Sequence, residues 1–541
     1  MSGSAVDRLA EAIVAEGCEH MFTLMGAGNL WLIEALARDH GVKIHHLRHE
    51  NGAVGAADGA ARATGGLGWC TVTQGPGFTN TITALLTAAK GRSPVILLVS
   101  DSSNLDPARF PFAGGVQALA PESILEPLGI DWVRAEGERA GEQLRETARR
   151  ARSEKRTIAF IMPAGLDRIP AAPLAPAETP ADLAAATPDA SAVDGIVSCI
   201  EGASHPLIVV GTGVVEAGAG EQVARLGERI GADVVTSVPA SGALGAHAAV
   251  LGQFGGFSID AAERAVQQAD LLIAIGVSLN VFQTRSGAFL AGKKLVRIDL
   301  DPRACAVPAP DAGAVGDAAE VLDALLAGLG AGAEAGATGE KGPRRLIEPY
   351  DDLSEPGAID PRSLSAALDA LLPERRRIIV DNGHFGAFPM IHMRHRAPRS
   401  LIWLPDFGAV GSALAASYAS ATVDPSTQSV LFIGDCGLYM TLGDLETAVR
   451  ERTPLIVVCM NDGAAGSELV HMTDWGVPPE QAIFGYADLA AVARGMGAQG
   501  ALIREISEIE AALGQWRPED GPLLLDCHVS RAVRSPIYDH V

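Results

Sequence analysis

The sequence predicts an α/β protein built from three doubly wound, parallel-sheet domains. Short runs of Val, Ile and Leu recur along the chain, and each is followed by a helical pattern. Continuous apolar runs of this kind are typical of parallel strands that are buried on both faces. Two stretches rich in Pro, Gly and Ala, 170–190 and 327–345, lack apolar periodicity and separate three blocks. The predicted domains are 1–170, 190–328 and 355–541.

The apolar runs that we expect to form strands occur in all three blocks. They are 69–74 and 94–101, then 206–211, 232–238, 270–276 and 294–301, then 376–383, 429–435, 454–462 and 522–529. In doubly wound sheets, ligands bind beyond the carboxyl ends of the strands. We therefore expect the functional site at those ends.

The composition argues against several classes of partner. The 541 residues include 42 basic and 65 acidic side chains, a formal net charge of −23. Such an acidic surface disfavours nucleic acid and anionic membranes. The seven cysteines form no CxxC pair, and the longest uncharged run, 407–423, is too short and too rich in Ala and Ser to span a membrane. With no secretory signal expected at the N-terminus, the composition predicts a soluble, cytoplasmic protein with reduced thiols.

Two acidic residues follow neighbouring predicted strands in the third block. One strand ends at Asp435, a helix is expected over about 441–452, and the next strand ends at Asp462. Parallel neighbours joined by one crossover helix bring both acids to the same edge of the sheet. Carboxylate and main-chain oxygens suit Mg²⁺, and amides at a helix N-terminus suit phosphates. Aspartate alone is a common turn former, but the two together favour a metal and phosphate site.

Residues 434–462, GDCGLYMTLGDLETAVRERTPLIVVCMND, resemble the thiamine-diphosphate-binding signature, in which GDG is followed after a helix by NN. The chain departs from it twice, since Cys436 replaces the middle glycine and Asp462 the second asparagine. Both replacements keep a compact loop and an oxygen ligand. The resemblance implies Mg²⁺ ligands, namely Asp435, Asp462 and the main-chain carbonyl of Ala464, and diphosphate-binding residues, namely Gly434, Asp435, Cys436, Gly437 and Asp462.

Two further segments of the third block resemble the same family. DFGAVGSALAAS, residues 406–417, resembles a segment of acetolactate-synthase-like enzymes in which an apolar side chain wedges between the two cofactor rings. Val410, by itself an ordinary core valine, takes that place, and the carbonyl of Gly408 would accept a hydrogen bond from the 4′-amino group. DNGHFG resembles a second diphosphate-facing loop, which implicates Gly383, His384 and Phe385.

The first block resembles the pyrimidine-binding domain of this family, in RHENGAVGAADGAARATG, 48–65, and TVTQGPGFTN, 71–80. Glu50 falls on the cofactor-activating glutamate. A carboxylate bonded to N1′ of the aminopyrimidine promotes loss of the thiazolium C2 proton. Glu50 would therefore act as a general acid–base through the pyrimidine ring rather than on C2 directly. A lone glutamate at a helix start would instead stabilise the helix dipole. The family builds each site from two subunits, which implies a homodimer or homotetramer.

The second block carries only a weak nucleotide-binding signal. Gly211 and Gly213 follow a predicted strand, but Glu216 stands where the dinucleotide fingerprint needs its third glycine. The block resembles the family's central domain, which holds FAD in acetolactate synthases and ADP, CoA or nothing in relatives. The element that contacts FAD reads GVSLNVFQTR, 276–285, in this chain, so we expect no FAD.

The resemblance leaves open which reaction follows cofactor activation, because side chains above the cofactor decide it. Glu468 lies where pyruvate-decarboxylase-like members carry a catalytic glutamate, although their paired histidines are not evident here. The catalytic candidates are Glu50, Glu468 and Gln74. The candidates for lining the substrate pocket are Ala27, Gly28, Asn29, Phe78 and His471, of which the last could equally be a surface histidine.

The expected function is that of a thiamine-diphosphate- and Mg²⁺-dependent carboligase or C–C lyase, acetolactate-synthase-like, acting on a 2-keto acid or a 2-hydroxy ketone. Two other enzymes fit the same motifs, a simple 2-keto acid decarboxylase and a 2-hydroxyacyl-CoA lyase. A non-catalytic homologue that binds the cofactor is the alternative from another class. The retained Glu50, Asp435, Asp462 and Val410 argue against it.

Overall fold

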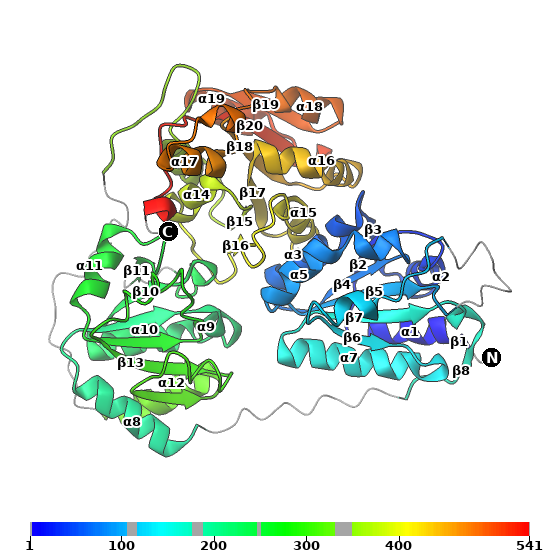
Figure 1. Cartoon of the computed structure of the whole chain (residues 1–541), viewed down its shortest axis with the longest axis horizontal. Helices are drawn as coiled ribbons and strands as arrows, with labels where there is room; N and C mark the ends of the chain where they lie inside the picture. The colour runs from blue at the N-terminus through cyan, green and yellow to red at the C-terminus, as the bar shows by residue number, and fades with distance from the viewer. Residues whose placement is uncertain (1–2, 105–115, 176–187, 246–249, 331–348, 540–541) are drawn as a thin grey trace.

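Three six-stranded sheets account for nearly all strands of the computed structural model, which describes residues 3–104, 116–175, 188–245, 250–330 and 349–539. Within each of these sheets every described pair of neighbouring strands is parallel. Helices pack against the sheets, and the three units form a triangle (Figure 1). The predicted fold class is confirmed.

The first sheet has the order β3-β2-β4-β5-β7-β6. Its strands are β2 (His20–Leu24), β3 (Lys43–His46), β4 (Gly68–Val72), β5 (Val95–Asp101), β6 (Asp131–Arg134) and β7 (Ile158–Pro163). Its helices are α1 (Ala5–Ala15), α2 (Leu30–Glu34), the π-helix η1 (Ala35–Asp39), α3 (Glu50–Thr64), α4 (Pro76–Thr79), α5 (Ile82–Lys90), α6 (Glu122–Leu125) and α7 (Ala140–Glu154). A two-stranded antiparallel pair, β1 (Gly3–Ser4) and β8 (Pro170–Ala171), joins the start of the domain to its end.

The central sheet has the order β11-β10-β9-β12-β13-β14. Its strands are β9 (Pro206–Val210), β10 (Asp233–Thr236), β11 (Val250–Gln253), β12 (Leu271–Ile275), β13 (Lys294–Asp299) and β14 (Ala312–Val315). Its helices are α8 (Ala190–Glu201), α9 (Thr212–Glu216), α10 (Gly220–Ile230), α11 (Asp260–Gln268) and α12 (Ala318–Gly328). The middle of each predicted linker, at 176–187 and 331–348, lies outside the described residues.

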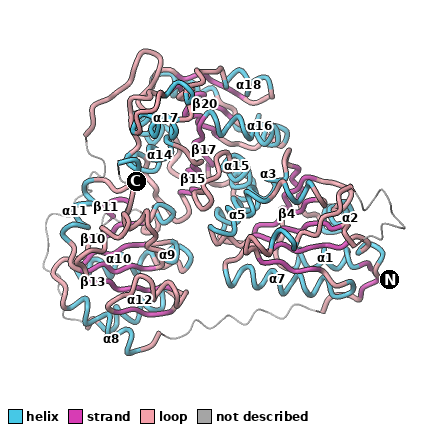
Figure 2. Tube along the Cα trace, in the orientation of Figure 1, coloured by secondary structure: helices cyan, strands magenta, loops and turns pink. Residues whose placement is uncertain are grey.

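The third sheet has the order β16-β15-β17-β18-β20-β19. Its strands are β15 (Arg376–Val380), β16 (Leu401–Trp403), β17 (Gln428–Gly434), β18 (Ile456–Asn461), β19 (Gln499–Ile503) and β20 (Leu523–His528). Its helices are α13 (Pro361–Leu371), α14 (Ala387–His392), α15 (Ala413–Val423), α16 (Asp435–Arg450), α17 (Gly466–Asp474), α18 (Leu489–Gly495) and α19 (Ser507–Gln515). Figure 2 shows these strands as a magenta layer between cyan helices.

The helix predicted over about 441–452 begins earlier than expected. The observed α16 starts at Asp435, directly after β17, and its backbone leaves helical geometry at Thr441, with φ −130° and ψ 19°. The run Cys436–Met440 was read as a loop because its glycine and lack of apolar periodicity hide the first turn. The kink divides α16 into a short segment at the end of the sheet and a longer one beyond it.

The small residues of α3 allow a second helix to pack directly on it. A Cβ on Gly59 would lie 2.4 Å from Cα of Ala416 in α15, and Gly55 faces the same helix. Ala415, Tyr418 and other residues of the third domain share one apolar core with α3. Figure 1 shows the blue α3 beside the yellow α15. The first and third domains of one chain are therefore joined by close helix packing.

Within the described ranges, none of the helices has the length and apolarity that crossing a bilayer requires. All seven cysteines carry free thiols, as predicted.

Candidate active site

Two carboxylates meet at the carboxyl edge of the third sheet. β17 and β18 are parallel neighbours, with Gly434 opposite Met460, so Asp435 and Asp462 follow them at the same edge. Burial raises the pKa of Asp435 to about 6. Burial and then repulsion from Asp435 raise the pKa of Asp462 to about 7. Asp435 is buried and Asp462 partly buried. Desolvated acids that repel each other suit a cation, so both remain predicted Mg²⁺ ligands.

Main-chain groups add to the predicted ligand set for Mg²⁺. Ala464 is buried, its N–H donates to Oδ1 of Asp462 at 3.0 Å, and its carbonyl oxygen lies 3.7 Å from Sγ of Cys436. A Cβ on Gly466 would lie 2.6 Å from Oδ2 of Asp462, so this glycine lets α17 begin close to the acid. Over the described part of the chain, no three His, Cys, Asp or Glu side chains gather as a metal site. Two carboxylates and a carbonyl therefore fit the cation better than a cluster of three side chains does.

The DNGHFG loop lies beside these acids. A Cβ on Gly383 would come within 2.7 Å of the Phe385 ring, which is buried. The ring of His384 points towards the C-terminal residues, because its Nε2 accepts the N–H of Ser535 at 3.0 Å. Burial lowers the pKa of His384 to about 4, which keeps the ring neutral and able to accept. Only the main chain of His384 is left to face a diphosphate.

The loop that carries Val410 is braced by a buried acid that the sequence reading overlooked. Asp381 accepts the N–H of Gly411 at 2.6 Å and that of Ala413 at 3.3 Å. The side-chain amide of Asn382 donates to the carbonyl of Ala409 at 2.7 Å. The Val410 side chain is 41 % exposed and touches the region of Gly437. Asp381 and Asn382 were read only as part of a diphosphate loop, because their partners lie far along the chain.

Glu50 begins α3 and is buried within the first domain. Its side chain is 8 % exposed, and Oε2 accepts the amide N–H of Asn80 at 3.0 Å. His49 caps the helix, with Nδ1 accepting the N–H of Asn51. Asn80 closes the TVTQGPGFTN segment, so both motifs of the first domain converge on one carboxylate. The sequence reading did not single out Asn80.

The predicted substrate-pocket residues separate into two groups. Ala27 and Gly28 are exposed at the carboxyl edge of the first sheet, and Gly28 donates its N–H to Oγ1 of Thr73 at 3.2 Å. Asn29 and Phe78 are not placed to line an open pocket, because they are 1 % and 0 % exposed. The Asn29 side chain accepts the Gly26 N–H and so braces its own turn, while Phe78 belongs to the apolar core.

Gln74 has a partner that the sequence did not indicate. Its Nε2 donates to Oε1 of Gln117 at 3.0 Å, and its Oε1 accepts from the hydroxyl of Thr73 at 2.7 Å. Gln117 follows a segment without a recognisable motif, so no pattern pointed to it. The two amides form a polar rim beside Gly28.

α17 carries Glu468 and His471 and is held by the C-terminal residues. Glu468 is exposed, whereas the ring of His471 stacks on Trp475 and meets the ring of Tyr538 edge-on, with centroids 5.2 Å apart in both cases. The Tyr538 hydroxyl donates to Oγ of Ser467 at 2.7 Å. His471 is therefore part of an aromatic cluster rather than a free surface histidine.

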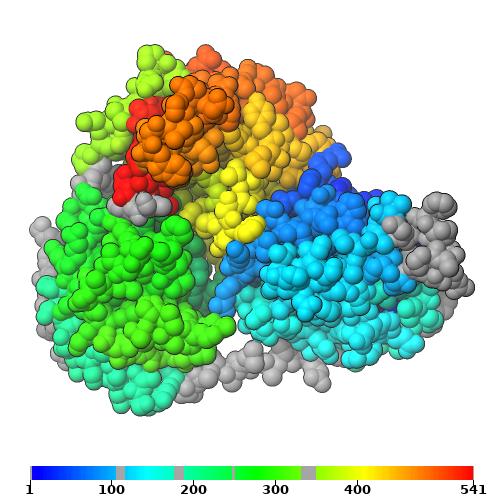
Figure 3. Space-filling view, viewed as in Figure 1, coloured from blue at the N-terminus to red at the C-terminus, as the bar shows by residue number. Residues whose placement is uncertain are grey.

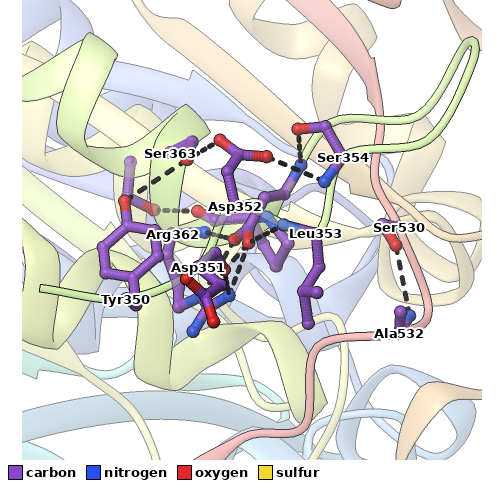
Figure 4. Close-up of polar contacts among 12 residues, drawn as sticks. Tyr350, Asp351, Asp352, Leu353, Ser354, Arg362, Ser363, Ser530 and Ala532 are labelled. Atoms are coloured by element: carbon purple, nitrogen blue, oxygen red, sulfur yellow. Dashed lines mark hydrogen bonds and ion pairs between the residues drawn. The ribbon is translucent and has the colours of Figure 1, made fainter.

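Residues 530–539, which we call the C-terminal segment, cross the edge of the third sheet at which Asp462 lies. Arg531 donates from Nε to the carbonyl of Asp462 at 2.5 Å. A cavity of about 260 Å³ lies between the segment, α17 and Phe388. The start of the segment is fixed because Ser530 donates its N–H to Ile359 at 2.8 Å and accepts from Ala532 at 3.2 Å, next to the contacts around Arg362 (Figure 4).

A second cavity, of about 350 Å³, lies where the three domains meet. Glu216 bridges it, accepting from Lys155 at 2.7 Å and from Arg399 at 2.5 Å. A Cβ on Gly213 would lie 2.6 Å from Cα of Gly276, so this glycine serves close packing of two strand ends. In the space-filling view, the green central and cyan first domains approach each other below the yellow third domain (Figure 3). Glu216 thus joins all three domains.

The chain matches three parts of one family. Residues 4–117 match the N-terminal TPP binding domain of thiamine pyrophosphate enzymes, 193–325 the central domain and 381–527 the C-terminal TPP binding domain. The chain therefore belongs to the thiamine pyrophosphate enzyme family, and it is a thiamine-diphosphate-dependent enzyme. Thiamine diphosphate as cofactor is confirmed, and Mg²⁺ is typical of the family.

Relatives along the whole chain have different activities. An acetolactate synthase large subunit of Mycobacterium tuberculosis is 26 % identical over 539 residues, covering 93 % of this chain and 92 % of the relative. A probable 2-ketoarginine decarboxylase of Pseudomonas aeruginosa is 26 % identical, covering 97 % and 93 %. A sulfoacetaldehyde acetyltransferase of Castellaniella defragrans is 25 % identical, covering 94 % and 89 %.

A solved structure shares the fold. The thiamine diphosphate-dependent 4-hydroxybenzoylformate decarboxylase of Rhodococcus jostii RHA1 superposes with a TM-score of 0.80 at 17 % identity, covering 98 % of this chain and 99 % of that one. At this identity the likeness concerns the three-domain architecture alone.

Proposed function

We propose that the protein is a Mg²⁺-dependent carboligase or C–C lyase that acts on a 2-keto acid or a 2-hydroxy ketone. The observation that carries the proposal is the pair Asp435 and Asp462, which lie desolvated at adjacent strand ends beside the carbonyl of Ala464. In this role the two carboxylates and the carbonyl hold Mg²⁺. The main chain of Gly383, His384, Phe385, Gly434, Cys436 and Gly437 holds the diphosphate.

The chain's own residues prepare the bound cofactor. Thiamine diphosphate supplies a nucleophilic carbon that adds to carbonyl groups. Val410, fixed through Asp381 and Asn382, would lie between the two rings, and the carbonyl of Gly408 would accept from the amino group of the pyrimidine. Glu50 holds a proton at N1′ of the pyrimidine, and Asn80 orients its carboxylate.

We further propose that each site joins two copies of the chain. Glu50 accepts a hydrogen bond within its own domain, and in this proposal a second chain presents its Glu50 to the cofactor held by Asp435. Apolar side chains at the edge of the third sheet support this, because Val410, Tyr439 and Met440 are 41 %, 48 % and 68 % exposed in the single chain. Contiguous exposed apolar surface marks an interface. The assembly is a homodimer or homotetramer.

Residues above the cofactor select the outcome. Glu468 is exposed, its charge acts on Cys436, and it can give a proton to a carbanion. Gln74 with Gln117 offers neutral donors to a carbonyl or carboxylate. The relatives' names include both a synthase and decarboxylases, so a simple 2-keto acid decarboxylase and a 2-hydroxyacyl-CoA lyase are the alternatives. The free thiols support a cytoplasmic setting, and the acidic surface opposes nucleic acid and membrane partners.

The test is incubation of the holoenzyme with pyruvate, with Glu50→Gln as the inactive control. A C–C coupled product supports a carboligase, and acetaldehyde supports the simple decarboxylase. If neither forms, the donor is another 2-keto acid or hydroxy ketone, and a panel of each is assayed in the same way. Turnover of no member of either panel would overturn the substrate class.

A further inference from the structure

A buried carboxyl on α16 has no role in the site described above. Asp444 is 4 % exposed and lies beyond the kink at Thr441, on the longer segment of the helix. Its Oδ1 has no hydrogen-bond partner among the described residues. Burial raises the pKa of Asp444 to about 7, although the Arg48 N–H donates to the carboxyl. An under-satisfied buried carboxyl is costly, so its retention calls for a structural or functional reason.

Asp444 touches the first turn of the helix that Glu50 begins. A Cβ on Gly52 would lie 2.6 Å from each carboxyl oxygen of Asp444, so a larger residue at this position would have to displace the carboxyl. Gly52 follows Glu50 by two positions, and the amides of this first turn lack intrahelical partners. The Asp444 carboxyl therefore lies against the positive end of α3.

Neighbouring contacts hold the same stretch of chain along α16. Arg48 forms a two-pronged ion pair with Glu446, at 2.5 and 2.7 Å. The hydroxyl of Thr447 donates to the carbonyl of His46 at 3.3 Å. The residues that precede Glu50 therefore pack against α16, the helix that begins at Asp435.

We propose that Asp444 is a positioning residue for Glu50. It fixes the first turn of α3 against α16 and thereby sets the position of the Glu50 carboxylate relative to the cofactor. The inference rests on the proposed role of Glu50 and extends it to a residue that does not touch the cofactor. Misplacement of a catalytic group by about 1 Å is expected to cost about 100-fold in rate. Metal and diphosphate binding are assigned to residues outside the longer segment of α16 and are expected to be spared.

The experiment changes both residues of the contact, Asp444 and Gly52. Asp444→Ala removes the carboxyl, Gly52→Ala pushes against it, and the double variant places a methyl group where the carboxyl was lost. Gly55→Ala is the matched control, because its Cβ would meet its nearest atom at an ordinary 3.6 Å. The readouts are the rate of C2 proton exchange of the bound cofactor, its circular dichroism bands and the Kd for the cofactor with Mg²⁺.

We expect each single variant to slow C2 exchange by about 100-fold and to alter the dichroism, with the Kd unchanged within about threefold. The double variant should regain at least about tenfold of the lost rate, and Asp444→Asn, which keeps shape and acceptor, should exchange at nearly the wild-type rate. Thermal unfolding of each variant shows whether it is folded.

Three results would overturn the inference: exchange at the wild-type rate in Asp444→Ala, no recovery in the double variant, or a Kd that rises as far as the exchange rate falls. The same experiment distinguishes failure of the role of Asp444 from failure of the proposed function. If the wild-type protein itself does not accelerate C2 exchange, the role of Glu50 fails. If wild type and Asp444→Ala accelerate it equally, only the role of Asp444 fails.

Discussion

Asp381 accepts the main-chain N–H of Gly411 across 2.6 Å and so fixes the loop that presents Val410. The acid is fully buried and stands directly after β15, one strand away from Asp435. The proposed wedge between the cofactor rings is therefore rigid because a carboxyl behind it binds its backbone. Replacing that carboxyl should act on cofactor binding without touching the metal ligands.

Asp381 should make the thermal stability of the cofactor-free protein depend on pH. Burial raises its pKa from 3.8 to about 7, so the folded state favours the protonated form. Its contribution is fully present below about pH 4 and is lost as the pH rises through about 7. Relative to Asp381→Asn, the wild-type unfolding temperature should fall between those limits, corresponding to about 4 kcal/mol at most. Parallel pH profiles of both proteins would refute this.

Asp462 should tolerate replacement by asparagine and not by alanine. Asparagine keeps an oxygen ligand and removes the repulsion from Asp435, whereas alanine removes the ligand. We expect Asp462→Asn to bind the cofactor with Mg²⁺ within about threefold of wild type, and Asp462→Ala to bind at least about 100-fold more weakly. Titration by tryptophan fluorescence measures both. Equal binding by the two variants would remove Asp462 from the metal site.

Arg531 should strengthen cofactor binding from outside the ligand set. Its Nε donates to the carbonyl of Asp462, and its charge lies close enough to lower the pKa of both acids. Losing one charge-assisted hydrogen bond should weaken binding by about tenfold in Arg531→Ala. Arg504→Ala, an exposed arginine of the same domain, is the control. An effect of the same size in both variants would mean that only surface charge matters.

The two-chain site predicts that inactive variants restore each other. In a mixture of Glu50→Gln and Asp435→Ala chains, each hybrid dimer has one site with both defects and one with neither. Random mixing should recover about one quarter of the wild-type activity. Analytical ultracentrifugation and assays after joint refolding follow the exchange of chains. A mixture that stays inactive, although hybrids form, would place the whole site within one chain.

The parts of the site that the sequence predicts are those in which a local pattern carries the chemistry. The run of small residues after Glu50 predicts a closely packed helix, and the apolar runs before Asp435 and Asp462 predict neighbouring strand ends. Contacts between distant residues leave no such pattern, and Arg531 lies 69 positions from Asp462. Asp444 was not noticed, because an acid on an amphipathic helix is ordinarily solvated.

Some of the strands that the sequence did not predict are short and partly polar. β3 reads KIHH and β6 reads DWVR, so neither shows the apolar run that marks a buried strand. Both lie at the edges of their sheet, where one side of the strand is open to water. Two interior strands, β2 and β7, were not predicted either, and β15 ends three residues before its predicted end. The other interior strands were predicted to within two residues, as in the case of β12.

The account depends most on Glu50 as the residue that activates the cofactor. The most direct measurement is the rate at which the C2 proton of bound thiamine diphosphate exchanges with solvent, in wild type and in Glu50→Gln. We expect the wild-type protein to exchange it far faster than the free cofactor, and Glu50→Gln to bind the cofactor but exchange at least about 100-fold more slowly. A wild-type protein that binds the cofactor and exchanges its proton no faster than water does would contradict the account.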